Sequence, residues 1–176
     1  MSKEALRDWL ADRIPVIWFV VKFALLMILF YGLLAIPFFD RLLYANLEVN
    51  AWLANAILKA LGEETIVVGT TISSPVFAIA VHRGCDAIEP TWLFCAAIIS
   101  IHSSALRKGI GILCGAFLLH FLNLVRIVSL YWIGIHQPGI FHSAHVEIWP
   151  VLFILVEVLL FIAWIRLFPS KIKTDA

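Results

Sequence analysis

The stretch GIGILCGAFLLHFLNLVRIVSLYWIGI, residues 109–135, contains one charged side chain, that of Arg126. About 20 consecutive apolar residues are enough for a helix to cross the hydrocarbon core of a bilayer. An arginine in the middle of such a helix costs about 2.5–3.5 kcal/mol to insert, and a guanidinium group cannot lose its proton to avoid that cost. The stretch therefore predicts a membrane helix that holds a buried cation, and the cation needs a partner or a function.

Three other parts of the chain are similarly apolar, and together they predict an all-α integral membrane protein with about four transmembrane helices in a single domain, residues 1–176. The predicted spans are about 15–38, 87–102, 109–135 and 146–168. The second is short for a span, so its outer end is expected to lie below the membrane surface. The first is longer than the roughly 7–15 apolar residues of a signal peptide, and no small-x-small cleavage site follows it. We expect it to remain in the protein.

Composition supports a membrane protein and argues against several other classes. Hydrophobic residues make up 62% of the chain and charged residues 14%, against about 45–50% and 25% in soluble domains. The net charge is +1, and the chain has no basic tract, phosphate-binding glycine loop, Cys-x-x-Cys or His-Glu-x-x-His motif. Cys85, Cys95 and Cys114 are odd in number and lack metal-ligand spacing. We expect no metal site, no disulfide framework and no nucleic-acid partner.

The segment between the first two spans, residues 40–84, is expected to lie outside the membrane. Its first part predicts an extracytoplasmic interfacial helix that ends before Gly62, and residues 65–81 predict two short strands around a turn, a short β-hairpin. The helix is expected to place these residues on its apolar face: Leu43, Leu47, Trp52, Leu53, Ala56, Ile57, Ala60 and Leu61. Its polar side is expected to hold Glu48, Asn50, Asn55 and Lys59.

The distribution of Lys and Arg predicts the orientation, because cytoplasmic loops carry an excess of both. With a cytoplasmic N-terminus, the inner side carries Lys3, Arg7, Arg13, Arg107, Lys108, Arg166, Lys171 and Lys173, and the outer side carries Arg41, Lys59 and Arg83. Both termini are then cytoplasmic, in the inner or cytoplasmic membrane of the cell. This topology brings the start of the second span, the outer half of the third and the loop before the fourth into one extracytoplasmic layer.

That layer contains a thiol and a guanidinium group. Cys85 follows Gly84 at the start of the second span, where a helix N-terminus and nearby cations favour a thiolate; alternatively it is a small packing residue. Arg126 is either an anion or oxyanion binder, since a guanidinium in a dry site strongly stabilises developing negative charge, or one half of a buried ion pair. The possible ion-pair partners are Glu89, Glu147 and Glu157.

The same layer contains His142 and His145, just before the fourth span. Each of them could be an ordinary interfacial histidine. Alternatively, one of them is the base that activates Cys85, because a Cys–His pair is a common way to prepare a thiol for attack on a carbonyl. The two lie three residues apart and share roughly one helical face, so periodicity does not separate them. His145 directly adjoins the apolar run, which favours it as the base.

Three motifs in this order resemble the exosortase/archaeosortase family of integral membrane cysteine transpeptidases. They are Gly84-Cys85-Asp86-Ala87-Ile88, Asn123-Leu124-Val125-Arg126-Ile127, and the segment from His145 to Phe153. The resemblance covers roughly residues 76–168. The family usually reads Cys-Ser-Gly or Cys-Ala-Gly where this chain has Cys85-Asp86-Ala87, and commonly has glycine where Trp149 stands.

The resemblance implies a sortase-like peptidase and transpeptidase that needs no cofactor. Its partners would be membrane lipid and exported proteins that end in a short motif, a transmembrane helix and a basic tail. Cys85 would attack the scissile carbonyl and form an acyl-thioester. Arg126 would stabilise the oxyanion or donate a proton, and His145 would act as the base or stabilise the transition state. His142, Asn123 and Asp86 would bind substrate or orient these groups.

Two other functions are compatible with the residues. Histidines 82, 102, 120, 142 and 145 could ligate haem in a small electron-transfer protein, with His120 and either His142 or His145 as the outer pair. The second is a scaffold for cell-envelope assembly that has no catalytic activity. A scaffold function predicts that Cys85 is dispensable.

The predicted orientation can be tested by thiol labelling. A membrane-impermeant thiol reagent added to intact spheroplasts should label Cys85, which is expected at the outer surface, and not Cys95 or Cys114, which lie inside apolar runs. The labelled cysteines are identified by mass spectrometry. Labelling of Cys85 only after permeabilisation would reverse the orientation.

Overall fold

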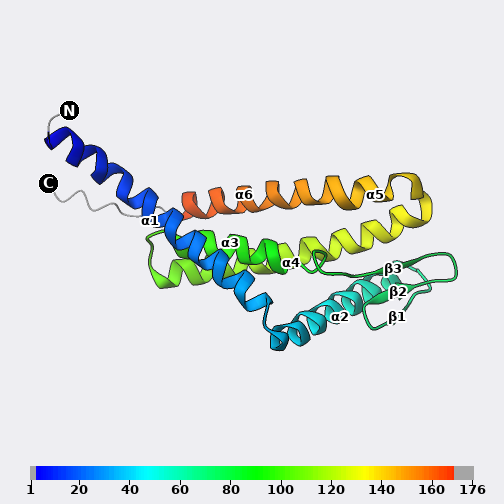
Figure 1. Cartoon of the computed structure of the whole chain (residues 1–176). Helices are drawn as coiled ribbons and strands as arrows, with labels where there is room; N and C mark the ends of the chain where they lie inside the picture. The colour runs from blue at the N-terminus through cyan, green and yellow to red at the C-terminus, as the bar shows by residue number, and fades with distance from the viewer. Residues whose placement is uncertain (1–2, 169–176) are drawn as a thin grey trace.

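The computed structural model describes residues 3–168 and is mostly helical (Figure 1). In chain order the elements are α1 (Lys3–Leu34), α2 (Pro37–Ala60), β1 (Ile66–Val68), β2 (Thr71–Ser73), β3 (Ala78–Ala80), α3 (Ile88–Ser100), α4 (Ala105–His136), η1 (Pro138–Ile140), α5 (Phe141–Ser143), the π-helical turn η2 (Ala144–Ile148) and α6 (Trp149–Leu167). A helical membrane protein is the fold class that this architecture supports.

Within the described residues, three helical segments are long and apolar enough to cross a membrane, which is one fewer than predicted. They are Arg13–Leu34, Ala105–His136 and Pro138–Leu167, with mean hydropathies of 2.4, 1.9 and 2.6. The remaining predicted span, 87–102, is the helix α3, which has 13 residues. At 1.5 Å per residue it is about 20 Å long, too short for a hydrocarbon core of about 30 Å. It ends early because Ala87 and Ile101, at its two ends, have non-helical backbone conformations.

The helix α3 packs inside the bundle, in contact with α1, α4 and α6. The start of α1, the end of α6 and the turn between α3 and α4 lie at one end of the molecule, and α2 and the strands lie toward the other (Figure 1). The indole Nε1 of Trp92 donates to the carbonyl of Leu26 at 3.1 Å, and its ring stacks on Phe30 at 5.2 Å. These contacts place the last turns of α1 level with the first turns of α3.

A helix, α2, forms where one was predicted, but the side chains that it buries agree only in part with the predicted apolar face. Its buried side chains are Leu43, Leu47, Asn50, Ala51, Ala54, Asn55 and Leu58. Asn50 and Asn55, expected on the polar side, are 3% and 6% exposed, whereas Trp52 and Leu61, expected on the apolar face, are 61% and 57% exposed. The small Ala51 and Ala54 instead let α2 pack closely against α4 and the sheet.

The segment predicted as a two-stranded hairpin holds a three-stranded antiparallel sheet in the order β1-β2-β3. Val68 pairs with Thr71, so Gly69 and Thr70 form the first turn, and Gly69 has the positive φ of 57° that such a tight turn needs. Ile72 pairs with Ile79 and is fully buried against the core formed with α2 and α4. The sheet thus covers the half of α4 that lies beyond α3 (Figure 1).

Glycines on α4 allow neighbouring aromatic side chains to approach its backbone. A Cβ atom at Gly115 would lie 2.0 Å from Cε1 of Phe94, and one at Gly111 would lie 2.3 Å from Nε1 of Trp164. Small residues at helix contacts in this way are typical of membrane bundles. Phe94 is 3% exposed and Trp164 5% exposed, so neither ring has space to move aside.

Gly115→Ala should therefore destabilise the protein by about 1–3 kcal/mol, the usual range for overpacking a filled core. Gly109→Ala is the matched control, because Gly109 lies on the same helix and a Cβ atom there meets nothing within 4 Å. Thermal unfolding in detergent would measure both, with a lower midpoint for Gly115→Ala alone. Equal midpoints would contradict the packing of Phe94 against Gly115.

Candidate active site

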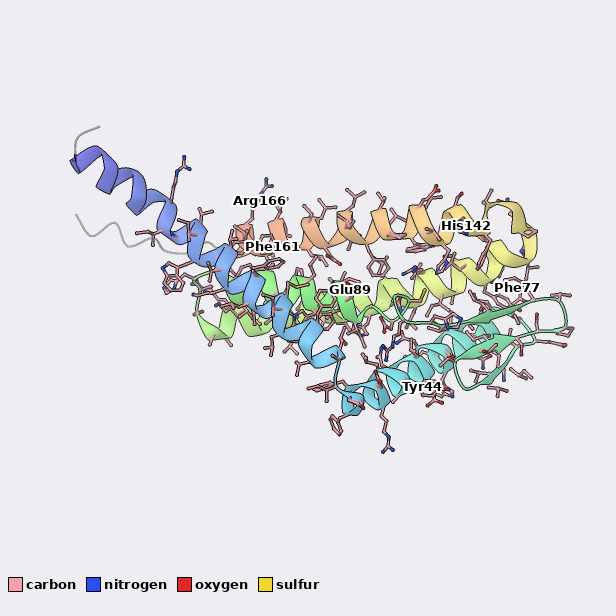
Figure 2. The ribbon with its side chains drawn as sticks, in the orientation of Figure 1. Tyr44, Phe77, Glu89, His142, Phe161 and Arg166 are labelled. Atoms are coloured by element: carbon pink, nitrogen blue, oxygen red, sulfur yellow. The ribbon has the colours of Figure 1, made fainter. Side chains whose placement is uncertain are left out.

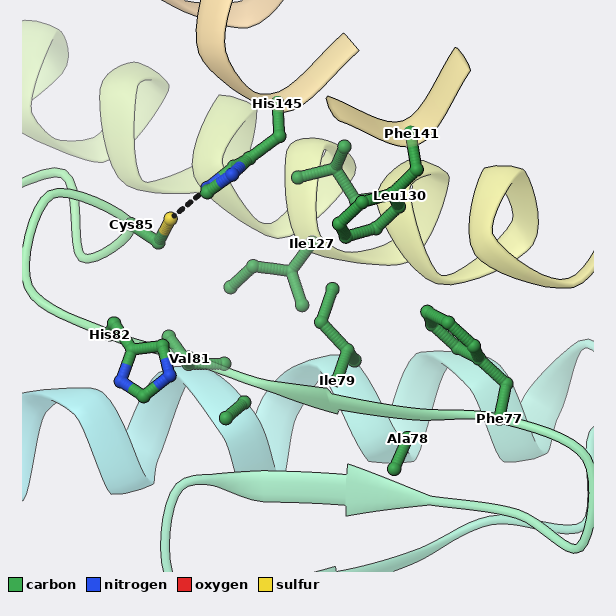
Figure 3. A pocket seen from close by; sticks show the side chains of 11 residues that line it. Phe77, Ala78, Ile79, Val81, His82, Cys85, Ile127, Leu130, Phe141 and His145 are labelled. Atoms are coloured by element: carbon green, nitrogen blue, oxygen red, sulfur yellow. Dashed lines mark hydrogen bonds between the residues drawn. The ribbon is translucent and has the colours of Figure 1, made fainter. Parts of the chain in front are cut away.

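The closest approach between the predicted reactive groups joins Cys85 and His145. The Sγ atom of Cys85 lies 3.1 Å from the Nε2 atom of His145 (Figure 3). Cys85 lies in the loop between β3 and α3, and His145 lies in the π-helical turn η2, 60 residues later in the chain. The structure therefore brings together the thiol and one of the two histidines expected to assist it.

The backbone of the Cys85 loop is unusual on both sides of the thiol. Gly84 has a φ of 85°, and Ala87 is the one residue other than glycine with positive φ in the described part of the chain, at 58°. A left-handed conformation costs an ordinary residue roughly 1–2 kcal/mol, so surrounding contacts must hold Ala87 there. Two contacts within the loop do so: the amide of Cys85 donates to the carbonyl of His82 at 2.9 Å, and Oδ1 of Asp86 accepts from the amide of Ile88 at 3.3 Å.

Arg126 is buried, with 7% of its surface exposed, and its guanidinium group contacts backbone on both sides of the site. Nη1 donates to the carbonyl of Gly84 at 2.9 Å, and Nη2 donates to the carbonyl of His145 at 3.4 Å. The guanidinium carbon lies 5.7 Å from the centre of the Phe153 ring, in a cation–π contact. Arg126 thus joins the thiol loop to the histidine turn.

The alternative of a buried ion pair for Arg126 is not what the described residues show. Of the three carboxylates considered, Glu89 accepts a hydrogen bond from Tyr31. Within residues 13–168, the guanidinium group of Arg126 donates its hydrogen bonds to main-chain carbonyls. Its positive charge is therefore solvated by carbonyl dipoles and an aromatic face, and it is not neutralised by a carboxylate.

Asn123, one turn before Arg126, holds the other side of the thiol loop. It is fully buried, and its Nδ2 donates to the carbonyl of Cys85 at 2.8 Å and to Oδ1 of Asn50 at 3.1 Å. Asn50 in turn donates to the carbonyl of Asn46 at 2.8 Å, and Asn46 donates to the carbonyl of Asp86 at 3.2 Å. Three asparagines from α2 and α4 therefore fix the main chain at the thiol.

Asn46 and Asn50 are functional residues that the sequence analysis missed. They lie one helical turn apart on α2, as Asn123 and Arg126 do on α4, and this spacing was the available signal. Asn50 was assigned instead to the polar, water-facing side of α2. Because a buried amide is stable when its hydrogen bonds are satisfied, a polar residue on a helix does not by itself mark the exposed face.

The turn η2 distinguishes His145 from His142, which the spacing of the two residues in the sequence could not do. Residues 144–148 form a π-helical turn, which adds a residue to the turn and shifts the side chains that follow relative to an α-helix. His145 is half-buried and lines the pocket that contains Cys85. His142 is exposed and does not line that pocket; Figure 2 shows it on the helical segment ahead of α6.

The thiol and imidazole open into an apolar cavity of about 320 Å³. One wall is the chain from Phe77 to His82, which includes β3, and the opposite wall is formed by Ile127 and Leu130 of α4 and Phe141 of α5 (Figure 3). A mostly apolar pocket with a few convergent polar groups is the usual form of a small binding site.

Burial raises the pKa of the Cys85 thiol, and this effect is larger than the lowering caused by the nearby charge of Arg126. The carboxylate of Asp86 raises the pKa further, and the hydrogen bond with the main chain of His82 lowers it. A helix N-terminus was expected to favour the thiolate, but α3 begins three residues after Cys85, at Ile88. Burial therefore opposes the thiolate form of Cys85, and Nε2 of His145 is placed to accept the thiol proton.

In the outer pair proposed for haem, His120 with His142 or His145, His120 and His145 each already have another close neighbour. Nε2 of His145 lies against Cys85, and Nδ1 of His120 lies 2.9 Å from the carbonyl of Ala116. Among the described residues, no group of three or more His, Cys, Asp or Glu side chains could hold a metal ion. Comparison of the chain with protein-family models, curated proteins and solved structures finds no match in any of the three.

The protonation state of Cys85 can be measured through its reaction with iodoacetamide. In a variant carrying Cys95→Ala and Cys114→Ala, the alkylation rate should rise with pH and reach half its maximum above the pKa of about 8.5 of a free cysteine. The sign follows from burial, which disfavours the thiolate and so raises the pKa. A midpoint below 8.5 would contradict the effect of burial, and one below about 7 would mean that Cys85 rests as a thiolate at neutral pH, as in a pair with a protonated His145.

Proposed function

We propose that this protein is a membrane-embedded cysteine peptidase and transpeptidase of the exosortase/archaeosortase type. The observation that carries the proposal is the 3.1 Å separation of Cys85 Sγ and His145 Nε2 at the wall of an apolar cavity. A nucleophile within hydrogen-bond reach of a base is the arrangement that covalent catalysis requires. The groups come from three distant segments, each containing one of the motifs that resemble this family.

In the proposed reaction, His145 takes the proton of the Cys85 thiol as the sulfur attacks the scissile carbonyl carbon. The new C–S bond gives a tetrahedral oxyanion. When it collapses, the C–N bond breaks, the leaving amine receives the proton from His145, and an acyl-thioester remains on Cys85. An acceptor nucleophile then attacks the thioester, gives its proton to His145, and releases the product as the thiol is restored.

Arg126 is suited to two tasks in this reaction. Its hydrogen bonds to the carbonyls of Gly84 and His145 keep the nucleophile and the base at a fixed separation. Its Nε–H group is buried and has no hydrogen-bond partner within the described residues, so the guanidinium retains a donor for an oxyanion. A preorganised cation in a water-poor site stabilises developing negative charge more than it would in water.

The depth of the site suits a substrate anchored in the membrane. The spanning part of α1 has 22 residues, about 33 Å at 1.5 Å per residue, so it crosses the hydrocarbon core and ends near the interface. Because its end is level with the start of α3, Cys85 lies at that interface. We infer from the Lys/Arg bias that this is the extracytoplasmic side. Both termini are then cytoplasmic, because α3, although shorter than a span, returns the chain to the end where α1 starts (Figure 1).

The proposed substrates are exported proteins whose C-terminus carries a short motif, a transmembrane helix and a basic tail. The helix would anchor such a protein beside the bundle and present the preceding peptide at the level of Cys85. Neither alternative function is favoured by a contact in the site. The scaffold function remains directly testable, because it predicts that Cys85 can be replaced without effect.

The function is tested by the processing of such proteins in cells, followed as a mass shift on gels. Cys85→Ala should abolish processing because no nucleophile remains, and Cys85→Ser should be nearly inactive because a hydroxyl is a poorer nucleophile. His145→Ala should reduce the rate at least about 100-fold, as expected for loss of a general acid or base. His142→Ala is the matched control and should have a clearly smaller effect, since His142 is exposed.

Each variant must insert to wild-type levels, which immunoblotting of membranes establishes. Normal processing by Cys85→Ala would rule out the thiol mechanism and favour the scaffold. An inactive His142→Ala beside an active His145→Ala would assign the base to the other histidine.

A further inference from the structure

The strand β3 forms one edge of the sheet, and this edge faces the cavity at Cys85. In the described residues the sheet ends at β3, which pairs with β2 alone. Residues 77–82, which contain β3, line the cavity together with Cys85 and His145. Figure 3 shows this strand passing beneath the cavity toward the thiol. An open strand edge is a template for pairing with another extended chain.

The register shows which main-chain groups of β3 are free. The amide of Val81 donates to the carbonyl of Thr70 at 2.9 Å, and the amide of Ser74 donates to the carbonyl of Phe77 at 2.8 Å. Ile79, between them, pairs with Ile72. Because neighbouring residues of a strand direct their amide and carbonyl groups to opposite sides, Phe77, Ile79 and Val81 face β2. The amide and carbonyl groups of Ala78 and Ala80 therefore face away from β2, along the open edge.

We propose that the substrate peptide binds in an extended conformation as a fourth strand on β3, paired with the main chain of Ala78 and Ala80. This inference rests on the proposed function, since it assigns the binding mode for the peptide that Cys85 attacks. The open edge and the reactive groups line one continuous cavity, so a peptide held on the edge reaches the thiol without leaving the pocket.

The chemistry of the cavity also describes the peptide. Main-chain pairing contributes affinity in strand addition, while pockets for alternate side chains give specificity. The wall opposite β3 contains Ile127, Leu130 and Phe141 and is apolar. Successive side chains of a strand point to opposite faces of the sheet, so every second residue of the peptide lies on the face that carries Ile72 and Ile79 and packs on α4. The substrate segment on one side of the scissile bond should therefore have an apolar side chain at every second position.

The test measures protection of Cys85 by a defined peptide, acetyl-Val-Ala-Val-Ala-Val-amide, which does not depend on turnover. The rate of alkylation of Cys85 by iodoacetamide, followed by mass spectrometry, should fall as the peptide is added. In a series with one N-methylated amide at each position, protection should weaken about tenfold at alternate positions, since loss of one paired hydrogen bond of about 1.4 kcal/mol changes affinity tenfold. The intervening positions should tolerate methylation.

A proline substitution tests the enzyme side of the same contact. Ala80→Pro removes an amide that faces the cavity and should abolish protection, whereas the ladder to β2 does not use that amide. Val67→Pro is the matched control: its pairing with Ile72 places its amide on the far edge of the sheet, and protection should persist. Proline is tolerated at such outward positions of edge strands, and a normal alkylation rate without peptide verifies that the site remains intact.

The outcomes separate this inference from the proposed function. No protection, or equal loss at every methylated position, overturns strand addition even if Cys85→Ala fails to process substrates. Loss of protection at alternate methylated positions supports strand addition even if no processing of exported proteins is found in cells. A second copy of the chain on the same edge would instead give disulfide-linked dimers of Ala80→Cys, and that result would also overturn the inference.

Discussion

The guanidinium group of Arg126 is the constraint on which the site depends. A buried charge is costly unless it is well solvated, and here the loop before Cys85 and the turn at His145 both provide a carbonyl for it. Removing the guanidinium would leave two buried carbonyls without these donors and release both segments. Because no carboxylate among the described residues neutralises the cation, its field also reaches Cys85 and partly offsets the effect of burial on the thiol pKa. The Arg126 side chain therefore affects both the positions of Cys85 and His145 and the pKa of the Cys85 thiol.

The asparagine network extends this constraint beyond the spanning helices. Asn46 and Asn50 belong to α2, which packs along α4, and they reach the thiol loop directly and through Asn123. Amides suit this task because each one both donates and accepts and adds no charge to a buried site. The position of the thiol consequently depends on how α2 sits on the bundle as well as on the membrane helices.

Much of the architecture follows from the sequence, and what does not has physical causes. Apolar length identifies α1, α4 and α6, and the cost of Arg126 draws attention to the correct layer. Hydropathy does not reveal the buried face of α2, since in a membrane protein the outward face can be apolar and the inward face polar. The third strand, the π-helical turn at His145 and the left-handed Ala87 depend on distant contacts. The partner of Asn50, for example, lies 73 residues away.

The separation of Cys85 and His145 along the chain also affects how the protein is made. Cys85 leaves the ribosome well before Asn123, Arg126 and His145, and its loop has little to hold it until α4 has been inserted. The base arrives only with the last helical hairpin. Under the proposed function, the thiol is therefore an ordinary cysteine during synthesis, and the Cys85–His145 pair forms only after the final membrane segment has packed. A chain arrested or truncated before η2 would carry the nucleophile without the means to activate it.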